Sequence, residues 1–206
     1  LRIYNADGSV AREVDPGELI LTSLENGGSE RMFAVANSPR HPSELFAFDG
    51  SGFTRWTTHN PWLSEIDFGE QRTYTYTARD GQQIEGVLIE PVGGAPRGGA
   101  PLIMDVHGGP EAHESNGWVT NYSGPGQVAA GQGYAVFLPN YRGSTGYGTA
   151  FAKAHQNDYA GKEFNDIVDA KRALVSEGIA DGDRTGITGG SYGGYASAWG
   201  ATALSE

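Results

Sequence analysis

The sequence predicts an α/β fold in which a mainly parallel sheet is covered by helices on both faces, preceded by a run of short antiparallel strands. From about residue 70 onward, apolar strand-like runs alternate with segments of helical periodicity, which is typical of parallel sheets with helices on both sides. Before that point, turn signals separate short segments rich in β-branched and aromatic residues. We therefore expect two domains, residues 1–69 and residues 70–206.

Residues 1–69 are expected to form about one blade of a β-propeller. Their predicted strands lie in the segments ELILTSLE, ERMFAVANS, ELFAFD and FTRWTTHN. Short antiparallel strands at this spacing suit one blade, although a piece of a β-sandwich would look similar. A single blade contains no internal repeat that could separate the two architectures, so both stay open on the residues alone.

The predicted sheet of residues 70–206 begins with a hairpin around Asp80-Gly81, formed by RTYTYTARDG and QIEGVLIEP. The Pro/Gly-rich segment 91–100 is interpreted as a hairpin loop rather than a domain linker, because strands flank it closely. Buried strands are then expected at PLIMDVHGG and YAVFLPN, with a helix near GPGQVAAGQG between them.

A longer amphipathic helix is predicted in EFNDIVDAKRALVSEG, with Gly178 as its stop. The apolar residues that recur at helical spacing are Phe164, Ile167, Val168, Leu174 and Val175. The short strand RTGIT and the small-residue helix GYASAWGATAL complete the predicted order. The acidic side chains are interpreted as scattered and as mostly a solvated surface.

The junction between that strand and that helix contains a G-x-S-x-G pattern centred on Ser191. In a chain with 32 glycines, the bare pattern is weak evidence. The context is stronger, because a nucleophile elbow requires a strand, a sharp turn and a helix, so that the serine hydroxyl stands above the sheet. We therefore interpret Ser191 as a catalytic nucleophile, against the alternative of a glycine-rich structural turn.

A second glycine-rich loop, His107 to Pro110, follows an earlier predicted strand. Acyl-transfer enzymes need hydrogen-bond donors where the carbonyl oxygen becomes negative. Backbone N–H groups of this loop and of the residue after the serine can supply them. Alone, the loop favours an ordinary turn; paired with the elbow, it favours an oxyanion hole.

A third segment, NYRGSTGYG, contains Arg142, which we interpret as structural support.

In this order and spacing, HGGP, NYRGSTGYG and GGSYGGY resemble the prolyl oligopeptidase family of serine peptidases, and within it the acylaminoacyl-peptidase and dipeptidyl-aminopeptidase branch. The similarity covers roughly residues 70–206, and SPRHPSELFAFD…FTRWTTHN resembles the family's last propeller blade. The resemblance implies the end of a β-propeller followed by the N-terminal half of an α/β-hydrolase domain, truncated after the elbow. It also implies a peptide substrate and no cofactor or metal.

The resemblance implies a role for each matching position. Ser191 is the nucleophile, and the backbone amides of Tyr192 and Gly109 form the oxyanion hole. The supporting loops contain His107, Gly108, Pro110 and Arg142. Related branches carry a tyrosine side chain in the oxyanion loop, whereas this loop reads His-Gly-Gly-Pro, so a backbone donor is assigned instead.

The expected catalytic base is not among the histidines of this sequence. In α/β-hydrolases the triad follows the order serine, acid, histidine, whereas all five histidines precede Ser191: His41, His59, His107, His113 and His155. His107 is expected to make local hydrogen bonds, and His113 and His155 to be solvated. The chain starts at Leu1 and stops inside an apparent helix. We expect an inactive fragment whose parent carries the acid and the histidine further along.

Charge and composition exclude other classes. A net charge of −11 and a pI near 4.8 argue against nucleic-acid or anionic-membrane partners, and no apolar run reaches the length of a membrane span. The absence of cysteine fits a reducing compartment, so a cytoplasmic location is expected.

The favoured function is a serine peptidase that hydrolyses short peptides through an acyl-enzyme, with homo-oligomerisation left open. A carboxylesterase and a non-catalytic scaffold are the alternatives.

Overall fold

The chain folds into two compact units, each with its own sheet. The computed structural model describes residues 1–28 and 31–203. The first unit comprises Leu1–Ile66 with Asn116–Trp118, and the second comprises Asp67–Ser115 with Val119–Glu206. The Trp118 amide donates to the side chain of Asn37, which ties this short segment to the first unit.

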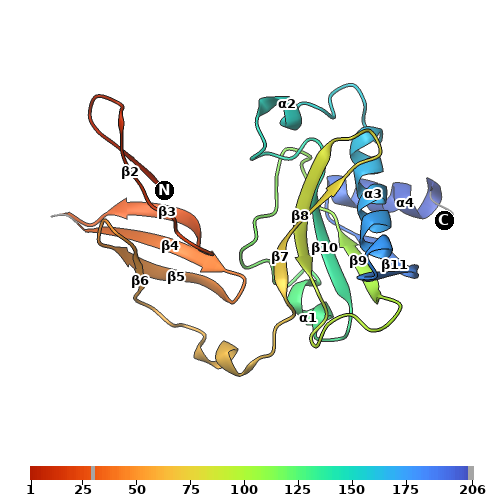
Figure 1. The fold of residues 1–206 in the computed structure, drawn as a ribbon, viewed down its shortest axis with the longest axis horizontal. Coiled ribbons are helices and arrows are strands. Elements are labelled where there is room, and N and C mark those ends of the chain that lie inside the picture. The colour runs from red at the N-terminus through yellow and green to blue at the C-terminus, as the bar shows by residue number, and fades with distance from the viewer. Residues whose placement is uncertain (29–30, 204–206) are drawn as a thin grey trace. The chain divides into compact units, whose positions relative to one another are not determined.

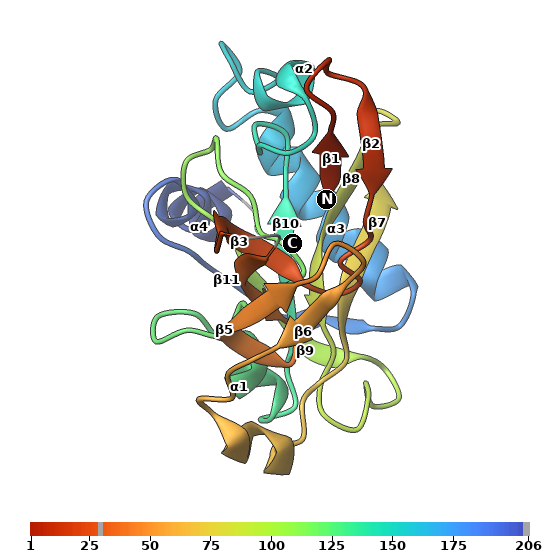
Figure 2. The same cartoon turned by 90° about the vertical axis from the view of Figure 1, so that its left-hand side faces the viewer.

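The first unit contains a four-stranded antiparallel sheet in the order β3-β4-β5-β6, drawn in red to orange in Figure 2. Its strands are β3 (Ile20–Asn26), β4 (Met32–Ser38), β5 (His41–Phe48) and β6 (Phe53–Arg55), so the four predicted strands are confirmed. The flanking elements are the hairpin β1 (Arg2–Tyr4) and β2 (Val10–Glu13), and the 3₁₀ helix η1 (Pro61–Glu65). Ala34, Ala36 and Phe46 form the buried centre of the unit.

A buried carboxylate ties β5 to the residues that follow β6. The Glu44 side chain is fully buried and accepts hydrogen bonds from the Thr57 hydroxyl, the His59 amide and ring, and Arg55. Burial opposes the ionisation of Glu44, but these hydrogen bonds outweigh it and lower its pKa to about 2. The interpretation of the acidic residues as solvated is therefore wrong for Glu44.

We expect acid to destabilise the first unit through Glu44. Its folded pKa of about 2 lies below its ordinary value of 4.5, so its stabilisation is complete above the ordinary value and is lost as the pH falls toward the folded value. In Glu44→Gln, the hydrogen-exchange protection of β5 should depend less on pH over that window than in the wild type. Equal pH dependence in the two proteins would contradict this prediction.

The second unit contains a five-stranded sheet in the order β11-β9-β10-β8-β7 (Figure 1). Its strands are β7 (Gln71–Thr77), β8 (Gln83–Ile89), β9 (Ala100–Asp105), β10 (Ala135–Asn140) and β11 (Ala180–Thr188). β9 lies parallel to β10 and to β11, whereas β8 is antiparallel to β10 and to β7. The expectation of a mainly parallel sheet is thus correct only for β10, β9 and β11.

The connection between β8 and β9 is not the predicted hairpin loop. β10 lies between the two strands, so β8 and β9 are not neighbours in the sheet. Segment 91–100 therefore crosses the position of β10 instead of forming a hairpin. Gly93 and Gly94 adopt φ values of +84° and +86°, which glycine adopts without the steric cost that other residues carry. The sequence could not distinguish the two connections, because the strand that fills the middle position comes later in the chain.

Helices cover both faces of this sheet, as predicted (Figure 1). α1 (Gly126–Ala130) packs with Val87 and Val136 on one face. α3 (Lys162–Ser176) and α4 (Tyr192–Ala203) pack with Leu88 and Phe137 on the other, and the short α2 (Thr149–Ala152) precedes α3. Within residues 1–28 and 31–203, no helix is both long enough and apolar enough to cross a membrane.

Helix α3 buries a row of carboxylates beside its apolar stripe. Three acids spaced three residues apart, Glu163, Asp166 and Asp169, are buried, which contradicts their interpretation as solvated. Conversely, Val175, predicted to belong to the core face, is exposed. Buried charges need partners, and the side chains that supply them are Tyr192 for Glu163, Arg142 for Asp166 and Arg79 for Asp169.

Candidate active site

Ser191 lies in a tight turn between β11 and α4. Its φ of +54° falls in the left-handed region, which residues other than glycine adopt at a cost in free energy. The residue is exposed, and α4 begins at the next position, Tyr192. An exposed serine with strained backbone between a strand and a helix is the geometry of a nucleophile elbow.

Glycines allow this turn to lie directly against the end of β9. A Cβ atom on Gly189 or on Gly193 would collide with the carbonyl oxygen of Val106, so a side chain at either position would force the backbone to move. A Cβ atom on Gly108 would lie 3.1 Å from the Cβ and 3.7 Å from the Oγ of Ser191. The fold therefore brings the HGGP loop and the serine turn together.

His107 joins the HGGP loop to the NYRGSTGYG segment. Its Nδ1 lies 2.7 Å from the Gly108 carbonyl oxygen, and its Nε2 lies 2.9 Å from the Ser144 hydroxyl. The ring stacks on Tyr141, whose hydroxyl donates to the His107 carbonyl. Burial lowers the pKa of His107, and its neutral ring carries the proton on Nδ1, which faces a carbonyl acceptor. The predicted local hydrogen bonding of His107 is confirmed.

The other members of the HGGP loop lie close to the same segment. Gly109 has a φ of +125°, and Pro110 is buried with its side chain beside the backbone of Gly143. The Thr145 amide donates to the Ala112 carbonyl at 2.9 Å, which pairs the two loops through their backbones. The NYRGSTGYG segment therefore supports the residues that follow the HGGP loop.

Arg142 anchors that segment from its buried side. Its backbone amide and its Nε donate to Oδ2 of Asp166 at 3.0 and 2.9 Å, and its guanidinium also donates to Asp80 in the β7–β8 turn. The Arg142 side chain is only 7% exposed and that of Asp166 is 0% exposed. Arg142 thus links α3, the hairpin turn and the loop beside the site, which agrees with a supporting role.

Each histidine ring is engaged with a residue other than Ser191. The ring contacts are His41 with Pro42, His59 with Glu44, His107 with Gly108 and Ser144, His113 with Thr145, and His155 with Glu111. The expectation that His155 is solvated is wrong, because its side chain is 1% exposed and lies under Gly143. Its polar sequence neighbours carry no signal of this burial.

Sequence reasoning missed Glu163, whose carboxylate contacts the residue after the serine. The Tyr192 hydroxyl donates to Oε1 of Glu163 at 2.8 Å. Burial and then the Glu163 carboxylate raise the pKa of Tyr192 well above its usual range, so the phenol keeps its proton. The one available signal was the spacing of Glu163, Asp166 and Asp169 along the edge of the apolar stripe.

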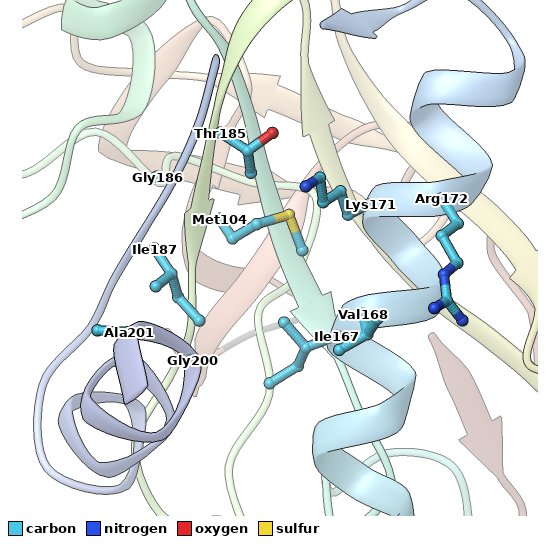
Figure 3. A pocket seen from close by; sticks show the side chains of 10 residues that line it. All are labelled: Met104, Ile167, Val168, Lys171, Arg172, Thr185, Gly186, Ile187, Gly200 and Ala201. Atoms are coloured by element: carbon cyan, nitrogen blue, oxygen red, sulfur yellow. The ribbon is translucent and has the colours of Figure 1, made fainter. Parts of the chain in front are cut away.

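A separate cavity of about 570 Å³ lies among α3, β11 and α4. Figure 3 shows Met104, Ile167 and Ile187 among the 10 residues that line it. None of these lining residues is a predicted site residue. The candidate active site is therefore the exposed serine turn with the HGGP loop beside it, and not this cavity.

Comparisons with known proteins agree with the motifs. Residues 120–206 match the model of the prolyl oligopeptidase family. The chain is 32% identical over 173 residues to the uncharacterized peptidase YuxL of Bacillus subtilis, which covers 82% of this chain and 26% of that protein. It is 46% identical over 102 residues to dipeptidyl aminopeptidase BIII of Pseudoxanthomonas mexicana, which covers 50% of this chain and 14% of that protein.

The fold is similar to that of solved structures. Pyrococcus horikoshii acylaminoacyl peptidase superposes with a TM-score of 0.79 at 31% identity, over 94% of this chain and 30% of that protein. The chain thus spans about a quarter of the length of the B. subtilis relative and under a third of the P. horikoshii structure. With its three motifs, the matched family model and these relatives, the chain belongs to the prolyl oligopeptidase family.

Proposed function

We propose that these residues are the end of a β-propeller and the N-terminal half of the α/β-hydrolase domain of a serine peptidase that cleaves short peptides. The observation that carries the proposal is the exposed Ser191, held at a φ of +54° beside the HGGP loop. Family membership supports it, as do relatives named as peptidases. A similar structure, acylaminoacyl peptidase in complex with Z-Gly-Gly-Phe-chloromethyl ketone, superposes with a TM-score of 0.80 at 31% identity, over 97% of this chain and 31% of that protein.

In the proposed reaction, Oγ of Ser191 attacks the carbonyl carbon of the scissile peptide bond. The hydroxyl proton passes to a histidine base, and the carbonyl oxygen becomes an oxyanion that accepts hydrogen bonds from the amides of Tyr192 and Gly109. The C–N bond then breaks as the base protonates the leaving amine, which leaves an acyl-enzyme on Ser191. Water hydrolyses that ester by the same steps and restores the hydroxyl.

We assign the base and its orienting acid to a histidine and an aspartate that follow Glu206 in the full-length protein. Each of the five histidines in this sequence is engaged elsewhere, and in α/β-hydrolases the acid and the histidine follow the serine along the chain. We therefore expect residues 1–206 by themselves to hydrolyse no substrate efficiently. The proposed chemistry uses no metal and no cofactor.

Labelling and a pair of substrates test the function of the full-length protein. We expect a fluorophosphonate probe to form an adduct that peptide mapping locates on Ser191. We also expect hydrolysis of a short peptide nitroanilide as well as a nitrophenyl ester. Hydrolysis of the ester alone would instead identify a carboxylesterase. A folded protein that neither reacts with the probe nor cleaves either substrate would be a non-catalytic scaffold.

A further inference from the structure

We propose that Glu163 is a positioning residue for the serine turn and acts through the hydroxyl of Tyr192. The inference rests on the proposed function, since it concerns the rate of the reaction at Ser191. Glu163 lies in α3, outside the HGGP, NYRGSTGYG and GGSYGGY motifs. Glu163 connects the start of α3 to the start of α4, because it contacts Tyr192. The backbone amide of Tyr192 is one of the two proposed oxyanion donors.

The Glu163 carboxylate is held firmly in one position. It is completely buried and accepts hydrogen bonds from the amides of Ala160 and Gly161, which precede α3. Ala160 has a φ of +58°, a strained conformation that this hydrogen bond helps to hold. The positive end of the α3 dipole also favours a carboxylate here. The group that receives the Tyr192 hydroxyl is therefore itself fixed.

Tyr192 is held along its whole length. Its hydroxyl donates to Glu163 at 2.8 Å, and its ring contacts the rings of Tyr141, Phe164 and Tyr195, with centroids 6.3, 5.6 and 5.6 Å away. A tyrosine side chain has only two rotatable torsions between ring and backbone. Fixing both ends of the ring therefore restricts the position of the Tyr192 Cα and of its amide.

This restriction matters because the Tyr192 amide must point at the oxyanion before the reaction begins. Donors that are already oriented cost no reorganisation in the transition state. Ser191 precedes this amide in a strained conformation, which persists only where the surroundings hold it. Without the Glu163 contact, the turn can relax and the donor can move away. Such a change weakens transition-state stabilisation and leaves substrate binding largely intact.

The opposite end of α3 offers a matched control. The Tyr74 hydroxyl donates to Oε1 of Glu177 at 2.9 Å, and Glu177 is the C-cap residue of α3. Tyr74 is 5% exposed and lies on β7. Tyr74→Phe thus removes the same kind of bond from the same helix without touching the serine turn.

The experiment compares Tyr192→Phe with Tyr74→Phe in the full-length protein, using a peptide nitroanilide and normalising rates by fluorophosphonate titration of active sites. We expect Tyr192→Phe to lower kcat by about tenfold or more with KM within about twofold. Tyr74→Phe should leave both constants within about twofold, although both variants lose some thermal stability. In a cycle with Glu163→Ala, the effects of the Tyr192 and Glu163 changes on kcat should not multiply, because each change removes the hydrogen bond between the Tyr192 hydroxyl and the Glu163 carboxylate.

The outcomes separate the two proposals. An active wild type in which Tyr192→Phe and Tyr74→Phe have equal kcat values overturns the positioning role and leaves the peptidase function intact. A wild type that neither labels nor hydrolyses overturns the proposed function, and the positioning role with it. If Glu163→Ala does not fold, the two phenylalanine variants decide the question alone.

Discussion

Replacing Ser191 with alanine should lower kcat by about 10⁴-fold or more while KM and thermal stability stay nearly unchanged. The hydroxyl oxygen forms the covalent bond to the substrate, and the oxyanion donors alone retain only a small part of the rate enhancement. Because Ser191 is exposed, its hydroxyl contributes little to the core. Alanine also adopts the same backbone conformation at a similar cost. Steady-state hydrolysis of a peptide nitroanilide by the full-length protein measures the effect.

Ser197 provides the control for this substitution. It lies in α4, and its hydroxyl donates to the Gly193 carbonyl at 2.8 Å, as serines in helices often do. Ser197→Ala should change kcat by no more than about twofold. If Ser191→Ala retained the rate of Ser197→Ala, the nucleophile would have to be another residue and the proposed mechanism would be wrong.

Replacing Arg142 with alanine should lower the free energy of unfolding of the second unit by about 3–5 kcal/mol. The substitution leaves the carboxylate of Asp166, which is 0% exposed, without the guanidinium that donates to it through Nε and Nη2. It also releases Asp80 in the β7–β8 turn. Denaturant unfolding of the full-length protein, with hydrogen exchange to assign the transition to this unit, measures the loss.

Arg79 is the matched comparison, because it also pairs with a carboxylate of α3. Its guanidinium binds Asp169, but the Arg79 side chain is 44% exposed, so water can replace it. Arg79→Ala should cost about 1 kcal/mol or less. Arg142→Lys should lie between the two alanine variants, because an ammonium group cannot reproduce the forked contacts. If Arg142→Ala and Arg79→Ala lowered the free energy of unfolding equally, burial of the arginine side chain would not determine the size of the loss.

The features that the sequence predicted correctly depend on local patterns. The strands of the first unit follow from alternating apolar residues and turn signals, and the helix α3 follows from its periodic apolar residues. The serine turn could be identified because Gly189 and Gly193 occupy positions where a side chain would collide with Val106. In each case the residues that signal the structure lie within a few positions of it.

The features that the sequence did not predict depend on partners far along the chain. Glu163 and Asp166 are buried because Tyr192 and Arg142 reach them, 29 and 24 residues away. An isolated acid on a helix gives no sign of such a partner and is ordinarily solvated. The position of β10 between β8 and β9 has the same origin, since strand order is set by the whole sheet.

The acidic row of α3 also bears on how this family can diverge. Three pairs, Glu163 with Tyr192, Asp166 with Arg142 and Asp169 with Arg79, bind α3 to the start of α4, to the loop after β10 and to the β7–β8 turn. In the two pairs whose members are mostly buried, Glu163 with Tyr192 and Asp166 with Arg142, losing one member leaves the other without its partner and costs more than losing both. We therefore expect the two positions of each of these pairs to vary together among relatives that keep this helix.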